Sequence, residues 1–208
     1  MKQIILLVLA LIAVANLSGI AQRYVGGDIS LLPEYENAGA QYKAHDGSPI
    51  SDLLPWLHEE GMNAMRVRLF VNPADHKAKY PSKYDPNACQ DLEYIIPLCK
   101  RIVDNGFDLM LDFHYSDTWA DPAKQWIPES WRGLTDEQLY DKIYQYTRET
   151  LLSLKEAGVT PSFIQPGNEI SYGMLWGTED SSASSLKKTL MGSNDNWDRL
   201  GKLLNQAV

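Results

Sequence analysis

The chain has 208 residues, of which 44% are hydrophobic, and it carries a formal net charge of -8. That length suits one domain with a sizeable core, by the usual guide of about 100 to 200 residues per domain. The negative charge repels nucleic-acid phosphates and anionic lipids, so it argues against nucleic acid and membrane surfaces as partners. A neutral ligand fits this charge better.

The N-terminal segment is typical of a secretory signal peptide. A lysine precedes an apolar run over Ile4–Val14, and small residues then offer cleavage after Ala15 or Ala21. The run is shorter than the roughly 20 apolar residues that a membrane-spanning helix needs. We therefore predict a leader over residues 1–21, a mature domain over residues 22–208, and a secreted or periplasmic location.

Beyond the leader, short apolar runs alternate with segments of helical periodicity. The runs predict four strands, at Tyr24–Ile29, Asn63–Val71, Phe107–Asp112 and Phe163–Gln165. The periodic segments predict four helices, over Ser51–Glu60, between Asp91 and Gly106, between Thr135 and Gly158, and over Asn196–Val208. This alternation predicts parallel βα units in an α/β fold.

Two architectures are built from parallel βα units. An open doubly wound sheet usually has a glycine-rich phosphate turn after its first strand, and Gly26-Gly27-Asp28 is too short for one. We therefore predict a TIM (β/α)8 barrel, which needs eight strands and about 250 residues. Because only four units are present, the chain resembles the N-terminal half of a barrel. Its first and fourth strands should then have open edges.

Capping residues mark two of the predicted helices. Asp91 should cap one helix, and Thr135 with Gln138 forms a capping box at the start of another. Pro97 lies inside the helix that follows Asp91, so it should kink that helix or delay its start.

Cys89 and Cys99 are the two cysteines of the chain. If both lie on one helix, their separation in sequence places them about 15 Å apart, too far for a disulfide. Either Cys89 lies outside the helix and a disulfide forms, or both cysteines are packing residues.

A glycine, an asparagine and a glutamate directly follow the fourth predicted strand, at Gly167-Asn168-Glu169. The carboxyl end of a barrel strand is where active-site residues lie. There Glu169 could protonate a glycosidic oxygen, while Asn168 could hold a sugar hydroxyl. The alternative is an exposed loop glutamate with no catalytic role.

Arg66 and Arg68 alternate on the second predicted strand and therefore face the same side. Inside a barrel both need carboxylate partners. They either orient and ionise a catalytic carboxylate or form a purely structural ion-pair network.

The third predicted strand leads into a polar and aromatic cluster. Asp112 and His114 share one face at its end, and the cluster continues through Asp117 to Trp119. Hydroxyl partners beside aromatic faces suit a polyol-binding site, whereas the alternative is a capped, hydrogen-bonded turn. The other histidines have no partners at metal-ligand or triad spacing, so we expect no metal site.

Four stretches together resemble glycoside hydrolase family 53, the arabinogalactan endo-β-1,4-galactanases. They are Gly26-Gly27-Asp28-Ile29-Ser30, Asn63-Ala64-Met65-Arg66-Val67-Arg68-Leu69, Leu111-Asp112-Phe113-His114-Tyr115-Ser116-Asp117-Thr118-Trp119-Ala120-Asp121-Pro122, and Gly167-Asn168-Glu169-Ile170. The third stretch is long and specific. The resemblance extends over the mature chain but over only about the first half of the family's domain.

The resemblance implies endo-hydrolysis of β-1,4-galactan by a retaining double displacement, without a cofactor. Glu169 would match the acid/base and Asn168 the residue that binds the sugar 2-hydroxyl. Arg66 or Arg68 would support the nucleophile. The cleft would be lined by Asp28, His114, Asp117 and Trp119. The full-length form is expected to be monomeric.

A retaining enzyme also needs a second carboxylate about 5 to 5.5 Å from the first. The family takes it from a glutamate on a later strand, and Glu179, in a polar serine-rich loop, cannot be that residue. We therefore expect this chain to be inactive alone. Two other functions stay open, namely a carbohydrate-binding half-barrel without catalysis and a related barrel glycanase acting on mannan or cellulose.

Overall fold

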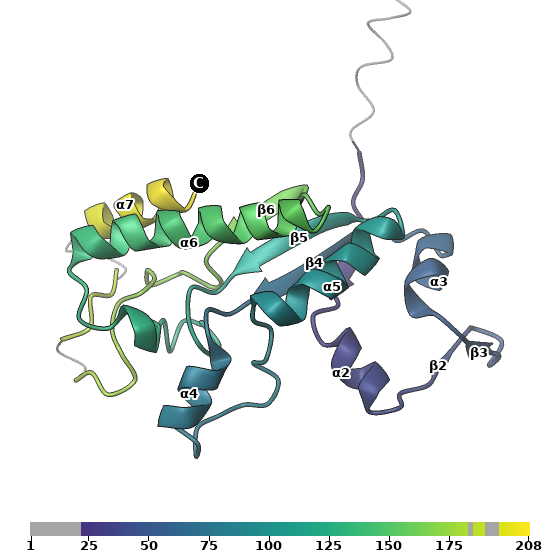
Figure 1. The fold of residues 1–208 in the computed structure, drawn as a ribbon, viewed down its shortest axis with the longest axis horizontal. Helices are drawn as coiled ribbons and strands as arrows, with labels where there is room; N and C mark the ends of the chain where they lie inside the picture. The colour runs from purple at the N-terminus through teal and green to yellow at the C-terminus, as the bar shows by residue number, and fades with distance from the viewer. Residues whose placement is uncertain (1–21, 183–184, 190–195) are drawn as a thin grey trace, which may run out of the picture.

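The computed structural model describes residues 22–182, 185–189 and 196–208, so the leader predicted over residues 1–21 lies outside the described residues. The main sheet has four parallel strands in the order β1-β4-β5-β6. Their bounds are Gly26–Asp28, Ala64–Leu69, Asp108–Phe113 and Phe163–Pro166. Neighbouring strands follow one another in chain order, as in a βα barrel and not as in a doubly wound sheet. Figure 1 shows β4, β5 and β6 side by side. The four predicted strands are confirmed.

The four predicted helices also form. They are α3 (Leu53–Glu59), α5 (Leu92–Asp104), α6 (Asp136–Glu156) and α7 (Trp197–Ala207). The Asp91 side chain accepts the Tyr94 N–H at 2.9 Å and so caps α5. Since α5 begins directly after this cap, Pro97 lies inside the helix and does not delay its start.

Several short elements were not predicted from the sequence. They are helix α2 (Leu32–Asn37), the hairpin of β2 (Tyr42–Lys43) and β3 (Pro49–Ile50), helix α4 (Pro73–Lys79) and the 3-10 helix η1 (Glu129–Trp131). Each has seven residues or fewer, which is too short for a periodic pattern to stand out. Helix α4 and η1 lie in the long connections that follow β4 and β5.

The main core lies between the sheet and the helices α5 and α6 (Figure 1). Alternate residues of β4, namely Met65, Val67 and Leu69, point into this core, while the two arginines of the strand point to the other face. Leu109 and Leu111 of β5 extend the buried face. Burying each such side chain contributes about 1.5 to 3 kcal/mol.

Both cysteines are free thiols. Cys99 lies on α5, where it is fully buried and belongs to the core. Cys89 lies two residues before the Asp91 cap, outside the helix, yet no disulfide joins the two. The packing interpretation therefore holds for Cys99.

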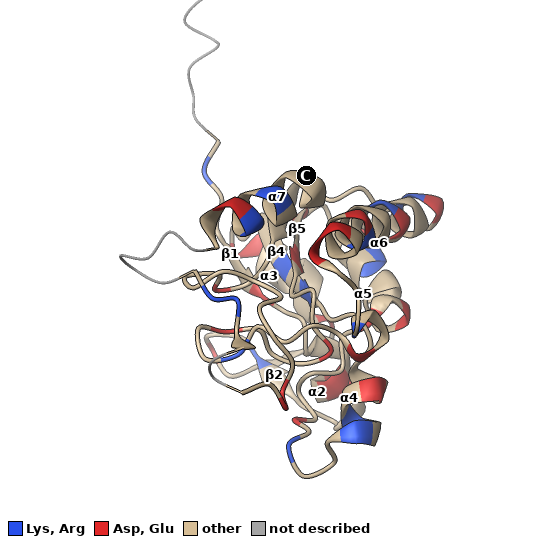
Figure 2. Ribbon diagram, turned by 90° about the vertical axis from the view of Figure 1, so that its left-hand side faces the viewer, with Lys and Arg blue, Asp and Glu red and all other residues tan. Residues whose placement is uncertain are grey.

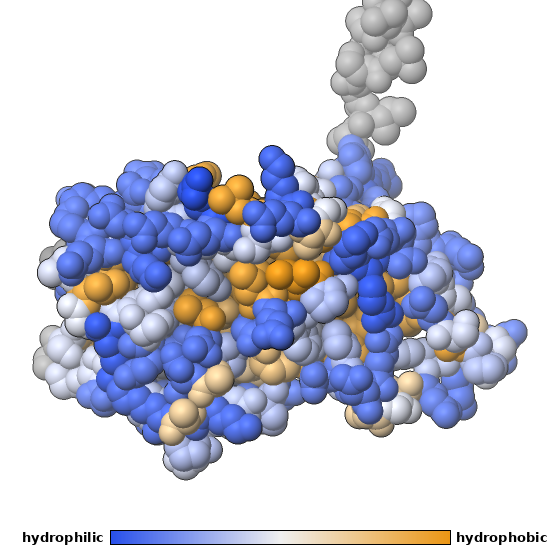
Figure 3. All heavy atoms as spheres, in the orientation of Figure 1, coloured by the Kyte–Doolittle hydropathy of each residue, from blue (hydrophilic) through white to orange (hydrophobic). Residues whose placement is uncertain are grey.

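The edges of the sheet remain open in the described part of the chain, because β1 pairs only with β4 and β6 only with β5. Beside the β6 edge, α6, β6 and the end of α7 line an open, largely apolar hollow of about 380 Å³ that includes Leu151 and Ile164. Apolar side chains also reach the surface between α5 and α6 and near the C-terminus (Figure 3). Among the described residues, no helix is long and apolar enough to cross a bilayer.

The capping box at the start of α6 should make a measurable contribution to the free energy of unfolding. Thr135 Oγ1 accepts the Gln138 N–H at 3.3 Å, and Gln138 Oε1 accepts the Thr135 N–H at 2.9 Å. Thr135→Ala removes one half of this box, so the free energy of unfolding should fall by about 1 kcal/mol in urea titrations. Thr135→Ser keeps the hydroxyl and is the control. Equal losses in both variants would contradict a capping role.

Candidate active site

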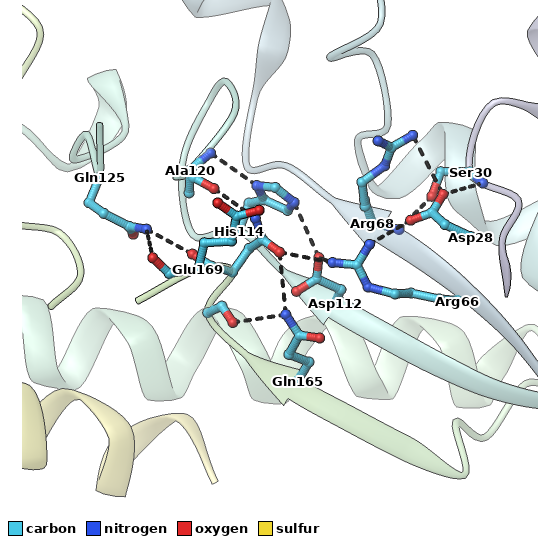
Figure 4. Close-up of polar contacts among 12 residues, drawn as sticks. Asp28, Ser30, Arg66, Arg68, Asp112, His114, Ala120, Gln125, Gln165 and Glu169 are labelled. Atoms are coloured by element: carbon cyan, nitrogen blue, oxygen red, sulfur yellow. Dashed lines mark hydrogen bonds and ion pairs between the residues drawn. The ribbon is translucent and has the colours of Figure 1, made fainter. Parts of the chain in front are cut away.

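One guanidinium group connects the carboxyl ends of all four strands (Figure 4). Arg66 of β4 donates from Nη1 to Asp28 of β1 at 2.6 Å and from Nη2 to Asn168, just after β6, at 2.9 Å. The same Nη2 donates to the Asp112 carboxylate of β5. Because the Asp112 side chain is 0% exposed, Arg66 supplies the positive charge that this buried carboxylate requires.

The second arginine of β4, Arg68, has longer contacts with its partners than Arg66 has. Arg68 Nη2 lies 3.6 Å from Asp28, and the guanidinium carbon lies 4.5 Å from the centre of the Trp119 ring. Trp119 is itself fixed by its indole N–H, which donates to Asp85 at 2.8 Å. Two arginines therefore face two aspartates, and both arginine positions lie within the fold on β4 (Figure 2).

His114 has a defined tautomer. Its Nδ1 accepts the Ala120 N–H at 3.1 Å, so the neutral ring carries its proton on Nε2. Nε2 lies 3.2 Å from the Asp112 carboxylate. Nε2 has no hydrogen-bond partner in the described part of the chain, so the buried imidazole lies against Asp112 without a hydrogen bond to it.

The chain turns sharply between β6 and the candidate acid. Gly167 has φ +95°, and a Cβ there would lie 2.7 Å from the Ile170 side chain, so the position requires glycine. Asn168 donates from Nδ2 to the Ala120 carbonyl at 2.7 Å. Glu169 has φ +49°, which is uncommon for a residue with a side chain. Its exposed carboxylate has no hydrogen-bond partner among the described residues.

These side chains line one open depression of about 570 Å³. Its lining comprises Asp28, Arg66, Arg68, His114, Trp119, Ala120, Asp121, Asn168 and Glu169. A carboxylic acid, an amide, an aromatic face and cationic groups thus converge at the carboxyl end of a parallel sheet. This is the composition that polyol recognition and acid–base chemistry require.

The comparison with protein families agrees with this geometry. The model for glycosyl hydrolase family 53 matches residues 24–208. The chain belongs to glycosyl hydrolase family 53.

Curated relatives in this family include proteins called arabinogalactan endo-beta-1,4-galactanase. The one from Cellvibrio japonicus is 36% identical over 214 residues, which cover 100% of this chain and 51% of the relative. The one from Thermothelomyces thermophilus is 35% identical over 190 residues, which cover 90% of this chain and 48% of the relative. The chain thus spans about half the length of the curated relatives it matches.

Solved structures of family 53 proteins match the fold. A structure from a study of two fungal beta-1,4-galactanases has a TM-score of 0.70 at 35% identity, and the match covers 90% of this chain and 48% of that one. The GH53 catalytic domain of Ignisphaera aggregans has a TM-score of 0.70 at 32% identity, with coverages of 91% and 48%. The predicted α/β class and TIM-barrel type are therefore confirmed, with the described sheet matching part of a family 53 barrel.

One predicted cleft residue lies apart from the depression. Asp117 is buried and accepts the N–H groups of Asn72 at 2.9 Å and Glu129 at 2.6 Å. It therefore joins the loops that follow β4 and β5. Burial raises the pKa of the Asp117 carboxyl to about 6, although the two N–H donors partly offset this rise.

Three residues that support the site are not among those predicted from the sequence. Ser30 is buried, and its hydroxyl accepts the Arg68 N–H at 2.9 Å. Asp121 lines the depression. Gln125 contacts the main chain at Asn168. Ser30 and Asp121 lie inside the stretches that resemble the family, whereas no pattern pointed to Gln125. In the described part of the chain, no cluster of three or more acidic, histidine or cysteine side chains could hold a metal ion.

Removing the Arg66 guanidinium should leave Asp112 as an uncompensated buried charge. We expect Arg66→Met to lower the free energy of unfolding by about 3 to 5 kcal/mol, measured by urea denaturation. The control is Arg101→Met, because Arg101 pairs with Glu36 at the surface and should contribute about 1 kcal/mol or less. Adding Asp112→Asn to Arg66→Met should recover part of the loss. Similar losses in the two single variants would contradict this account.

Asp117 should give the protein a specific pH dependence. Its folded pKa of about 6 lies above the ordinary value of 3.8, so the folded state holds the proton more tightly. This raised pKa contributes about 3 kcal/mol at most to the free energy of unfolding. The contribution is complete below about pH 4 and is lost as the pH rises through 6. Asp117→Asn should remove this loss in urea titrations between pH 4 and 7. Asp46→Asn, at an exposed carboxylate, is the control and should keep the wild-type fall in the free energy of unfolding. The same fall in Asp117→Asn would refute the assignment of this pH dependence to Asp117.

Proposed function

We propose that residues 22–208 form the acid/base half of the active site of a secreted endo-β-1,4-galactanase, with Glu169 as the acid/base. The observation that carries this proposal is the position of Glu169, next to Asn168 at the carboxyl end of β6 and open to the depression. The names of the family 53 relatives support galactan as the substrate. The predicted leader over residues 1–21 supports export.

Glu169 serves both steps of the proposed retaining reaction. In the first step, its proton passes to the glycosidic oxygen while a second carboxylate attacks the anomeric carbon, forming a covalent galactosyl-enzyme. In the second step, Glu169 takes a proton from water, which attacks the same carbon and releases the second carboxylate. The carboxyl group ends protonated, as it began, and the reaction requires no cofactor.

Asn168 is suited to hold the sugar 2-hydroxyl. Its Oδ1 accepts from Arg66 at 2.9 Å and its Nδ2 donates one hydrogen to the Ala120 carbonyl at 2.7 Å. These two bonds fix the orientation of the amide and leave the second Nδ2 hydrogen for a substrate oxygen. Trp119 offers an aromatic surface for the apolar face of a galactosyl ring, while Asp28 and His114 supply polar contacts.

The other two carboxylates that line the depression already contact other groups. Asp28 pairs with both arginines, and Asp121 accepts the N–H groups of Ala123 at 2.8 Å and Lys124 at 3.1 Å. We therefore assign the nucleophile to residues outside 1–208, with Arg66 or Arg68 as its support. On this proposal the 208-residue chain is inactive alone, and the complete barrel is a monomer.

Reducing-sugar release from β-1,4-galactan tests this proposal. The purified 208-residue chain is compared with a form extended at the 3′ end of the gene until eight strands are present. We expect activity only in the extended form, and Glu169→Ala should lower it roughly 100- to 10,000-fold by removing general acid–base catalysis. Glu156→Ala, at an exposed glutamate on α6, is the control and should retain activity.

The other possible results of this experiment would contradict parts of the proposal. Hydrolysis by the 208-residue chain would contradict its inactivity and the assignment of the nucleophile. An inactive extended form would contradict the galactanase function. Galactan binding measured by calorimetry would then favour a carbohydrate-binding barrel, whereas hydrolysis of mannan or cellulose would favour a related glycanase.

A further inference from the structure

Gln125 is a buried glutamine whose amide reaches the main chain beside the proposed acid/base (Figure 4). It lies between β5 and α6 and is 2% exposed. Its Nε2 donates to the Asn168 carbonyl at 2.7 Å and to the Glu169 carbonyl at 3.4 Å. A more distant contact, at 3.5 Å, connects it to the Asp121 carbonyl in its own loop. A buried amide with these partners is a connection between two active-site loops.

The two carbonyl groups held by Gln125 flank the Cα atom of Glu169. The Asn168 carbonyl belongs to the peptide plane before that atom, and the Glu169 carbonyl belongs to the plane after it. Fixing both planes fixes φ and ψ of Glu169, and therefore the direction of its Cα–Cβ bond. The Gln125 side chain can thus determine the direction in which the Glu169 side chain leaves the main chain.

The backbone of Glu169 requires such support. Its φ of +49° lies in the left-handed region, which is unfavourable for a residue with a side chain because Cβ comes too close to the main chain. Such conformations persist only where the surrounding structure holds them. Since the Glu169 carboxylate has no partner among the described residues, the main chain is what sets the starting direction of its side chain.

We propose that Gln125 is a positioning residue that aims the Glu169 carboxyl group at the glycosidic oxygen. This inference rests on the proposed function, because it needs Glu169 to act as the acid. Gln125 itself does not line the depression. Its effect passes through the peptide planes on either side of Glu169.

Mispositioning an acid has a distinctive kinetic consequence. A sugar leaving group is a poor one and needs a proton as the bond breaks, whereas a dinitrophenolate leaves without protonation. The ratio kcat/KM reports the steps up to formation of the galactosyl-enzyme. Loss of acid geometry should therefore lower kcat/KM for a galacto-oligosaccharide much more than for a dinitrophenyl galactobioside.

The experiment uses the extended form with two variants at this position. Gln125→Met keeps the side-chain length and removes the donor, while Gln125→Glu places an oxygen against two carbonyl oxygens. We expect kcat/KM on the oligosaccharide to fall about 100-fold, the typical effect of a displacement of about 1 Å. On the dinitrophenyl substrate, the fall should stay within about tenfold.

Gln90→Met is the matched control. Gln90 is also a fully buried glutamine, but its amide contacts Cys89 and not the Glu169 segment. Its substitution should change kcat/KM equally for the two substrates. Circular dichroism and Tm establish that each variant is folded.

The outcomes separate the inference from the proposed function. A wild-type extended form that is inactive on both substrates would overturn the galactanase proposal, and the role of Gln125 with it. An active wild type whose Gln125 variants lose both activities equally, or neither, would overturn only the role of Gln125. Failure of both variants to fold would make Gln125 a structural residue and would also overturn the inference.

Discussion

The contacts of the Arg66 guanidinium are the interaction on which the site depends. A single side chain on β4 binds oxygens of Asp28 on β1, Asp112 on β5 and Asn168 just after β6. Asp112 is fully buried, and an ionised carboxylate in that position is costly without a hydrogen-bonded cation. The same cation that makes burial of Asp112 tolerable also orients Asn168, so folding and site geometry are coupled at one group.

Strand register explains why these groups meet. Asp28 is paired with Arg66 across β1 and β4, and Arg68 is paired with Asp112 across β4 and β5. Side chains alternate between the two faces of a strand, so a shift of one residue would turn both arginines into the apolar core. Burial of alternate residues such as Val67 therefore selects the register that also assembles the site. The hydrophobic core and the polar cluster are two consequences of one pairing.

The sequence predicted the parts of this structure that leave a periodic or capping pattern, namely four strands, four helices and the shared face of Arg66 and Arg68. It could not predict where a loop side chain finds its partner. Asp117 lies in a family-like stretch, yet it binds main-chain N–H groups of two loops and not the depression. Gln125 binds main-chain carbonyls, which every residue possesses. Such contacts depend on tertiary geometry and leave no pattern in the sequence around Glu169.

Under the proposed function, the two halves of the barrel contribute different properties to the catalytic acid. The described half determines position, because Asn168 and Gln125 hold the main chain on either side of Glu169. It does not enclose the carboxylate, which remains exposed. Desolvation and a neighbouring carboxylate are the effects that tune an acid for two-step glycoside hydrolysis, and both require further strands around the depression. A half-barrel can therefore hold the acid in place without making it a catalyst.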